Sequence, residues 1–163
     1  MESSREPMPS LMKELQRMEF DYAHGKGIDF EPYREFMSAD ETRDWLRAWT
    51  GNPSVLGSEY LVFGQDGSGG LAAFWCARPD AEVLEQPVVF FGSEGQLGIV
   101  ASNFWDYLWL LAGGLGPREA VESPGAARLI QPHLSAFAGR HAPGNRQTPA
   151  EVLARARSCF PGF

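Results

Sequence analysis

The residues between Gly64 and Gly70 have the types and spacing that could bind a phosphate group. This stretch carries four glycines, at positions 64, 67, 69 and 70, with a serine among them. A phosphate-binding loop ends in Lys-Ser or Lys-Thr and opens a helix, because the free N–H groups of the helix N-terminus hold the phosphate. Here the lysine is missing and the flanking segments are predicted strands. The stretch is therefore interpreted as a hairpin turn.

Nucleophilic and metal chemistry have equally little support in the sequence. Ser68 lacks the surroundings of a Gly-x-Ser-x-Gly nucleophile, because position 66 is Asp66 and a strand, not a helix, follows the serine. The three histidines, His24, His133 and His141, belong to no His-x-x-x-His or Cys/His pattern. We therefore expect no metal site and no cofactor.

Carboxylates are the remaining candidates for catalysis in the centre of the chain. General acid–base chemistry needs two such groups that converge in one pocket. The central segment offers Asp66, Glu94 and Asp106. Each has a simpler role, as a turn residue, a loop tip and a first-turn acid at a helix N-terminus. The sequence therefore predicts a protein that is not an enzyme.

Cysteine usage and hydropathy indicate where such a protein works. Cys76 and Cys159 form no Cys-x-x-Cys pair, which favours reduced thiols. The first ten residues lack the basic and apolar regions of a secretory signal. The longest apolar run, residues 104–115, is interrupted by Asp106 and falls short of the ~20 residues of a membrane span. We expect a cytoplasmic protein that does not enter a membrane.

The apolar pattern predicts four helices and four strands. Capping motifs mark two of the helices, Ser38-Ala39-Asp40-Glu41 before the Trp45/Trp49 face and Thr148-Pro149-Ala150-Glu151 near the C-terminus. The predicted helices are 9–23, 39–51, 103–113 and 149–160, and the predicted strands are 60–64, 71–77, 87–92 and 97–101.

Glycine turns between the strands predict how they pair. Turns at 65–70 and 93–96 indicate consecutive hairpins, whereas 78–86 forms a polar, acidic loop. The expected fold is α+β, an antiparallel meander of about four or more strands flanked by helices. We expect one domain over 1–163, with a core at about 30–114 and a C-terminal extension at 115–163 in which prolines mark short turns before the last helix.

Charge is distributed unevenly over the 163 residues, whose net charge is −7. Residues 1–60 carry twelve acidic and seven basic side chains, and residues 61–114 carry six acidic ones and only Arg78. Residues 115–163 are basic, with six arginines and three glutamates. A nucleic-acid-binding face would need lysine and arginine among its aromatic residues. We expect no direct nucleic-acid binding, and an acidic centre that attracts a basic partner.

The order of these motifs resembles the SUKH superfamily, named in part for the yeast Smi/Knr cell-wall-synthesis regulator. The resemblance covers about Trp45 to Leu111. It is carried by a strand ending in Phe63-Gly64, the Asp66-Gly67-Ser68-Gly69-Gly70 turn, Pro87-Val88-Val89-Phe90, Gly92-Ser93-Glu94, and Ala101-Ser102-Asn103-Phe104 leading into Leu108–Leu111.

This resemblance implies a non-catalytic α+β domain that binds proteins. Many bacterial members are similar to immunity proteins, which neutralise a cognate polymorphic toxin, often a nuclease, by binding and occluding it. The acidic composition agrees with a basic toxin as partner. We place the contacts on turns that offer acidic groups beside glycine backbone: Asp66, Gly67, Ser68, Gly69, Asp80, Glu82, Glu85 and Glu94.

Two other functions remain open at this point. A general regulatory or scaffold domain would bind several cellular proteins instead of one toxin. A small-molecule enzyme or ligand sensor would need polar groups that converge in a pocket. The sequence leaves the oligomeric state and the identity of the toxin undetermined.

Overall fold

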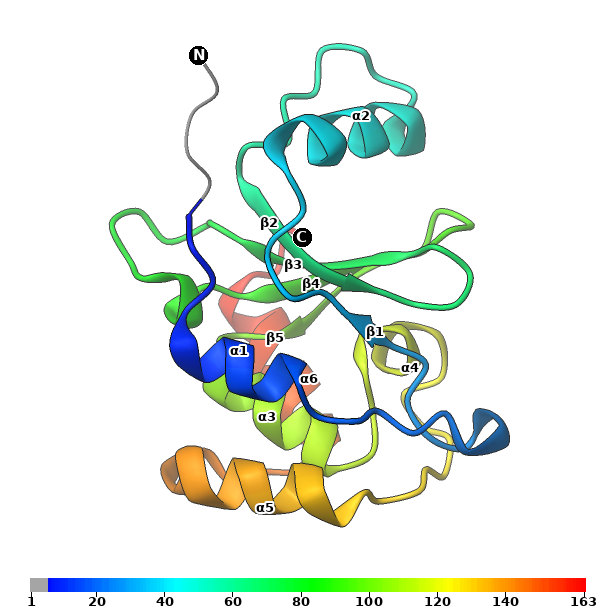
Figure 1. Cartoon of the computed structure of the whole chain (residues 1–163), viewed down its shortest axis with the longest axis vertical. Helices are drawn as coiled ribbons and strands as arrows, with labels where there is room; N and C mark the ends of the chain where they lie inside the picture. Colours follow the sequence, from blue (N-terminus) through cyan, green and yellow to red (C-terminus); the bar gives the residue numbers. More distant parts are fainter. Residues whose placement is uncertain (1–5) are drawn as a thin grey trace.

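An antiparallel sheet forms the centre of the protein, with helices around it (Figure 1). The structure is a computed structural model that describes residues 6–163. The strands are β1 (Glu31–Pro32), β2 (Tyr60–Gln65), β3 (Leu71–Trp75), β4 (Val88–Phe91) and β5 (Leu97–Ala101). The helices are α1 (Ser10–Gln16), α2 (Ala39–Thr50), α3 (Phe104–Ala112), α4 (Pro117–Glu122), α5 (Pro132–His141) and α6 (Pro149–Cys159). The predicted α+β fold is confirmed.

The five strands lie in their sequence order, and each is antiparallel to its neighbours. The β2–β3 and β4–β5 turns therefore lie at one end of the sheet, and the long β3–β4 loop lies at the other (Figure 1). Register shifts occur beside Val62 in β2 and beside Val88 in β4. The meander expected from the glycine turns is confirmed, with the short β1 added at the β2 edge.

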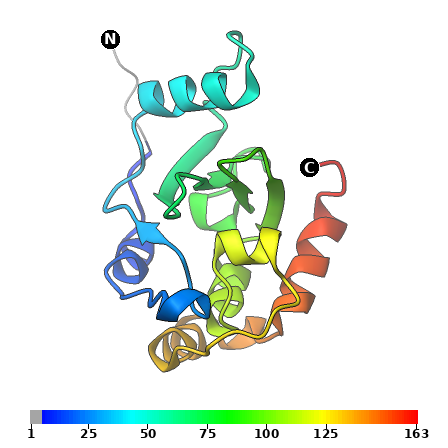
Figure 2. The same cartoon turned by 90° about the vertical axis from the view of Figure 1, so that its right-hand side faces the viewer.

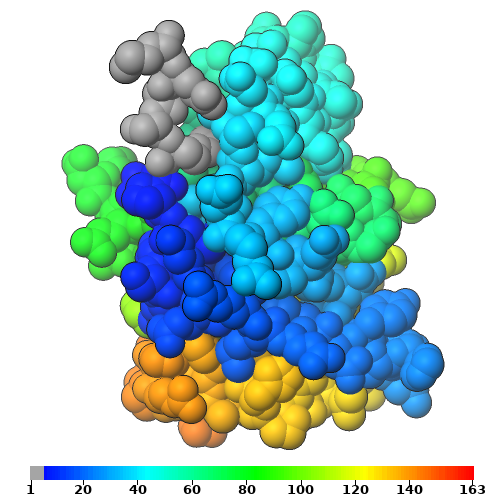
Figure 3. All heavy atoms as spheres, viewed as in Figure 1, coloured from blue at the N-terminus to red at the C-terminus, as the bar shows by residue number. Residues whose placement is uncertain are grey.

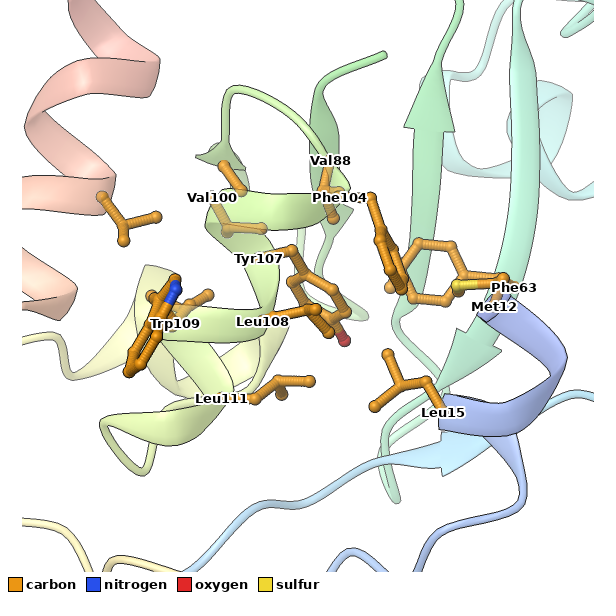
Figure 4. Close-up of a cluster of buried hydrophobic side chains, with 14 of the residues drawn as sticks. Met12, Leu15, Phe63, Val88, Val100, Phe104, Tyr107, Leu108, Trp109 and Leu111 are labelled. Carbon is orange, nitrogen blue, oxygen red and sulfur yellow. The ribbon is translucent and has the colours of Figure 1, made fainter. Parts of the chain in front are cut away.

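The main hydrophobic core lies between one face of the sheet and helices α1, α3 and α5. Figure 4 shows Met12 and Leu15 of α1 opposite Tyr107 and Leu108 of α3, with Phe63 of β2 beside them. All five side chains are almost fully buried. Since α3 also contacts β5, α5 and α6, the prediction that this almost wholly apolar helix is sandwiched in the core is confirmed.

The opposite face of the sheet is covered by α2 (Figure 2), and Phe160 and Phe163 after α6 pack there against Trp75. Trp45 and Trp49 of α2 stack with ring centroids 6.2 Å apart, and both contact the ring of Phe91 at their edges. The indole N–H of Trp49 donates to the carbonyl of Gly92 at 2.7 Å. The tryptophans of this helix therefore act in packing, as the sequence indicated.

Side-chain caps explain where three of the helices begin. Ser38, Asn103 and Thr148 each accept a hydrogen bond from the backbone N–H three residues on. Thr148 and Glu151 form the full reciprocal capping box. At the start of α2 the carboxylate of Glu41 accepts from the side-chain hydroxyl of Ser38, whereas in the box at Thr148 the carboxylate of Glu151 accepts from the backbone N–H.

The first helix is shorter than the predicted 9–23 and ends at Gln16. Ala23 and His24 have φ angles of 46° and 53°, which a right-handed helix cannot contain. The buried amide of Gln16 instead donates to the carbonyls of Tyr33 and Phe63, at 3.0 and 2.7 Å. The helix therefore ends at the residue whose side chain attaches α1 to β2 and to the segment after β1.

The interpretation of the prolines after residue 115 as marks of short turns was wrong for Pro117 and Pro132, whereas Pro124 does lie in a turn. Pro117 and Pro132 stand at the N-termini of α4 and α5, where a missing N–H costs nothing and the fixed φ angle suits a helix. Leu134 and Phe137 of α5 and Val152 of α6 belong to the main core. The residues after 114 thus help to build the same core as the sheet.

Candidate protein-binding surface

Two hairpin tips meet at one end of the sheet. The β2–β3 turn, residues 66–70, and the β4–β5 turn, residues 92–96, both extend beyond the strands on the right of Figure 1. The hydroxyl of Ser93 donates to the hydroxyl of Ser68 at 3.0 Å. This bond joins two turns that are 25 positions apart in the sequence.

Asp66 shapes the first tip from inside. Its side chain is only 2% exposed. The Oδ1 atom accepts from the N–H of Ser68 at 2.6 Å, from the Ser68 hydroxyl at 2.5 Å and from the N–H of Gly70 at 3.3 Å. The interpretation of Asp66 as a turn residue is confirmed, and its carboxylate is directed into the turn and away from solvent.

Both tips present bare backbone to solvent. Gly69 and Gly95 have φ angles of 94° and 91°, which strongly favour glycine. A Cβ atom built on either residue would have no other atom within 4 Å. Another protein can therefore approach the main chain closely at these two positions.

The second tip is fastened to the helices on either side of it. The side chain of Gln96 accepts from the N–H of Glu94 at 3.1 Å and donates to the carboxylate of Glu122 in α4 at 3.1 Å. On the other side, Trp49 of α2 holds the carbonyl of Gly92. The turn is thus fixed between α2 and α4, with the Glu94 side chain exposed at its apex.

Arg118 of α4 joins the first tip to the second. Its guanidinium contacts the carboxylates of Asp29 and Glu122, each at 2.5 Å. The other oxygen of Asp29 accepts from the N–H of Gly67 at 2.9 Å. A continuous chain of hydrogen bonds therefore runs from the first turn through Asp29, Arg118 and Glu122 to the second turn.

A buried glutamate supports this chain from beneath. The carboxylate of Glu119 is 5% exposed and accepts from the N–H of Gly116 and the N–H of Asp29, both at 3.0 Å. Burial raises the pKa of Glu119 above its ordinary value, although both hydrogen bonds favour the charged form. Glu119 thereby holds the loop that carries Asp29 against α4.

We call these residues the hairpin-tip surface: Asp29, Glu31, residues 66–70, residues 92–96, Arg118 and Glu122. Glu31 belongs to it because its carboxylate accepts from the side-chain amide of Gln65, at 3.4 Å. The exposed or half-exposed charges are four carboxylates, those of Asp29, Glu31, Glu94 and Glu122, and one guanidinium, that of Arg118. The surface is therefore acidic and fixed in shape.

The structure divides the predicted contact residues between the two ends of the sheet. Asp66, Gly67, Ser68, Gly69 and Glu94 lie together at the hairpin tips, as described above. Asp80, Glu82 and Glu85 are exposed on the β3–β4 loop at the opposite end (Figure 1). The eight residues therefore do not form one continuous surface.

Arg78 fixes the loop at that opposite end. Its guanidinium donates to the carbonyls of Glu85 and Ser102 and to the Ser102 hydroxyl, and it stacks on the ring of Phe160, 4.9 Å from the centroid. The side chain of Gln86 bonds the N–H and the carbonyl of Arg78, at 2.8 and 2.7 Å. The only basic residue of the central segment thus has a structural role.

Sequence reasoning missed Asp29, Arg118 and Glu122 as members of the surface. Asp29 and Arg118 are 89 positions apart, and no motif in either segment indicates that they meet. Their pairing depends on α4, a helix that the sequence did not predict. The acidic hairpin tips were visible in the sequence, whereas the residues that connect them were not.

Among residues 6–163, no three His, Cys, Asp or Glu side chains lie close enough together to hold a metal ion. No helix in the described part of the chain has the length and apolar character required to cross a membrane. Comparisons with protein-family models, with curated proteins and with solved structures found no match to this chain.

Proposed function

We propose that this protein acts without catalysis, by binding a basic protein through the hairpin-tip surface. The acidic charge of that surface supports the proposal, because its four carboxylates outnumber its one arginine, and those of Glu31 and Glu94 are exposed and not paired with it. Complementary charge steers a basic partner toward such a face and accelerates association.

The rigidity of the surface also favours binding. The two tips are joined by the hydrogen bond between Ser93 and Ser68, and the second tip is also bonded to α2 and α4. A surface that is already ordered loses little conformational entropy when a partner binds. Gly69 and Gly95 leave the backbone open to close approach, and the carboxylates around them provide charged contacts.

The specific role that we propose is that of a bacterial immunity protein of the SUKH type, which works in the cytoplasm. Its partner would be a cognate polymorphic toxin, possessing a basic surface such as nucleases use to hold phosphates. The order of the turn and strand motifs over Trp45–Leu111 supports the family assignment, and the acidic hairpin-tip surface supports the partner's charge. Binding would occlude the active site or a neighbouring surface of the toxin.

Co-expression with toxin-like reading frames that flank the gene tests this function. We expect the protein to restore growth to cells that produce the toxin, and to co-purify with it as one complex. The double variant Glu31→Lys/Glu94→Lys reverses two charges of the hairpin-tip surface and should weaken the rescue. The matched control Glu82→Lys/Glu85→Lys makes the same change of charge at the opposite end of the sheet, at two exposed positions, and should rescue normally.

Each contrary result has a definite meaning. Absence of both rescue and complex would refute the immunity function. Rescue lost in the control but retained in the hairpin-tip variant would place the contact at the β3–β4 loop. A tagged protein that captures several cellular proteins and no toxin would instead support the general regulatory or scaffold role.

A further inference from the structure

A groove lies beside the hairpin-tip surface, on the far side of Glu31. It has a volume of about 1040 Å³ and lies between the end of α1, residues 31–37 and the start of α2. Figure 3 shows this face of the molecule, with α1 in blue beside the lighter blue segment that leads from β1 to α2. Glu31 lines the groove and also belongs to the hairpin-tip surface, so the two are continuous.

The floor of this groove is fixed to the sheet. The N–H groups of Tyr33 and Met37 donate to the carbonyls of Phe63 and Val62 in β2, both at 2.9 Å. The buried amide of Gln16 bonds the Tyr33 carbonyl from the α1 side at 3.0 Å. The hollow is therefore part of the folded framework and does not depend on a loose loop.

Main-chain pairing is a poor way to fill the groove. A ligand that extends the sheet beyond β1 needs free N–H and C=O groups along that edge. Pro32 has no N–H, and the carbonyl of Tyr33 already accepts from Gln16. A ligand in this groove must therefore be recognised mainly through side chains.

The side chains that line the groove combine apolar surface with negative charge. Met18, Pro32 and Tyr33 are half-buried and offer apolar contacts. The charged lining consists of three glutamates, Glu31, Glu35 and Glu41, and two arginines, Arg17 and Arg34. Together with the adjacent hairpin-tip surface, this composition is complementary to a segment that carries basic and apolar residues.

We propose that the groove binds an extended segment of the partner protein that carries both apolar residues and lysine or arginine. Tyr33 offers an apolar contact and Glu31 a charged one on the same side of the groove, because both side chains contact Gln65, so a basic residue of the segment can reach Glu31 while an apolar residue beside it covers the Tyr33 ring. The inference rests on the proposed function, because the body of the same partner would lie on the hairpin-tip surface.

A synthetic peptide tests the groove without knowledge of the partner. The probe is a short peptide of alternating lysine and leucine, blocked at both ends, and the control is the same peptide with glutamate in place of lysine. Binding is followed by NMR on the isotope-labelled full chain. We expect the lysine peptide to shift the backbone amide signals of Arg34 and Glu35 and the side-chain amide signal of Gln16, and the glutamate peptide to leave them unchanged.

Charge variants show whether these signals report the groove. Glu35→Lys should weaken peptide binding about threefold to tenfold, equivalent to ~0.7–1.4 kcal/mol. Glu14→Lys makes the same change on an exposed part of α1 outside the groove and should weaken it much less. Equal weakening by both variants would mean that the peptide responds only to net charge, and the inference would be wrong.

The result separates this inference from the proposed function. Shifts confined to the hairpin tips, or no shifts at all, would overturn the groove as a binding site. Rescue by the protein and its loss in Glu94→Lys, which changes a residue outside the groove, would still support toxin binding through the hairpin-tip surface. Conversely, peptide binding in the groove without rescue by any flanking reading frame would refute the immunity function alone.

Discussion

Ser68 and Ser93 stand at the tips of two different hairpins, and their hydroxyl oxygens lie 3.0 Å apart. The Ser68 hydroxyl also donates to the carboxylate of Asp66, so the Ser93 hydroxyl donates in turn to Ser68. The three polar side chains form a chain of two hydrogen bonds that ends at the buried carboxylate of Asp66. These bonds join the two tips directly, which favours a preorganised binding surface.

Asp66→Ala should destabilise the protein and loosen the first tip. The change removes the acceptor of three hydrogen bonds, two of them from backbone N–H groups. We expect a loss of about 1–3 kcal/mol in the free energy of unfolding, measured by urea denaturation. Faster hydrogen exchange at Ser68 and Gly70 would locate the effect.

Glu94→Ala is the matched control for this change, because its side chain is exposed at the apex of the second tip. Its free energy of unfolding should stay within about 0.5 kcal/mol of the wild-type value. Equal stability of Asp66→Ala and Glu94→Ala would show that the Asp66 bonds do not support the turn.

Gln16→Leu should weaken the attachment of α1 to the sheet and lower the stability of the protein. The Gln16 amide is the donor to the carbonyls of Tyr33 and Phe63, and leucine leaves both without this bond. Its Oε1 atom has no hydrogen-bond partner among residues 6–163, so its removal offsets part of the cost. We expect a net loss of about 1–3 kcal/mol, seen as a lower urea midpoint. An unchanged midpoint would contradict this role of Gln16.

Local signals were sufficient to predict strands β2 to β5 and several helix ends. The glycine turns at 65–70 and 93–96 require backbone conformations that other residues rarely adopt, so they specify hairpins directly. The capping residues Ser38 and Thr148 act within one helical turn, and the structure shows both. Such features depend on neighbours in the sequence and are therefore visible in it.

Tertiary context decided the features that the sequence did not predict. Pro117 and Pro132 were interpreted as turn residues, but each begins a helix that the core then stabilises. The hairpin-tip surface likewise needs Arg118 to meet Asp29 across 89 positions. Nothing in either local segment contains that information.

Two glycines should respond oppositely to alanine. In Gly64→Ala the new Cβ would lie 2.2 Å from the ring of Phe30 and 2.9 Å from the carbonyl oxygen of Glu31. Since Phe30 is buried and packs on Phe63, the ring has little room to move. We expect Gly64→Ala to lose about 1–3 kcal/mol of stability through overpacking.

Gly139→Ala is the counterpart, in α5, where a Cβ would meet no atom within 4 Å. Alanine is the better helix former there, so the variant should gain about 0.5–1 kcal/mol. Thermal unfolding of both variants and the wild type measures the two changes in stability, which should have opposite signs. Destabilisation by Gly139→Ala would show that α5 is packed differently on its outer side.

The buried Glu119 should make stability depend on pH in a predictable direction. Burial raises the pKa of this carboxyl in the folded protein above its ordinary 4.5, so the folded state holds the proton more tightly than the unfolded state. This contribution to stability is fully present below pH 4.5 and is lost as the pH rises through the folded-state pKa.

Glu119→Gln removes that titration while keeping the shape of the side chain. The variant should be less stable than the wild type by a margin that is largest near the lower end of the range and shrinks as the pH rises, measured by urea unfolding in steps from about pH 4 to pH 7. Other titrating groups are common to both proteins and cancel in the difference. A margin that grows with pH would mean that the bonds from Gly116 and Asp29 outweigh burial and lower the pKa of Glu119 instead.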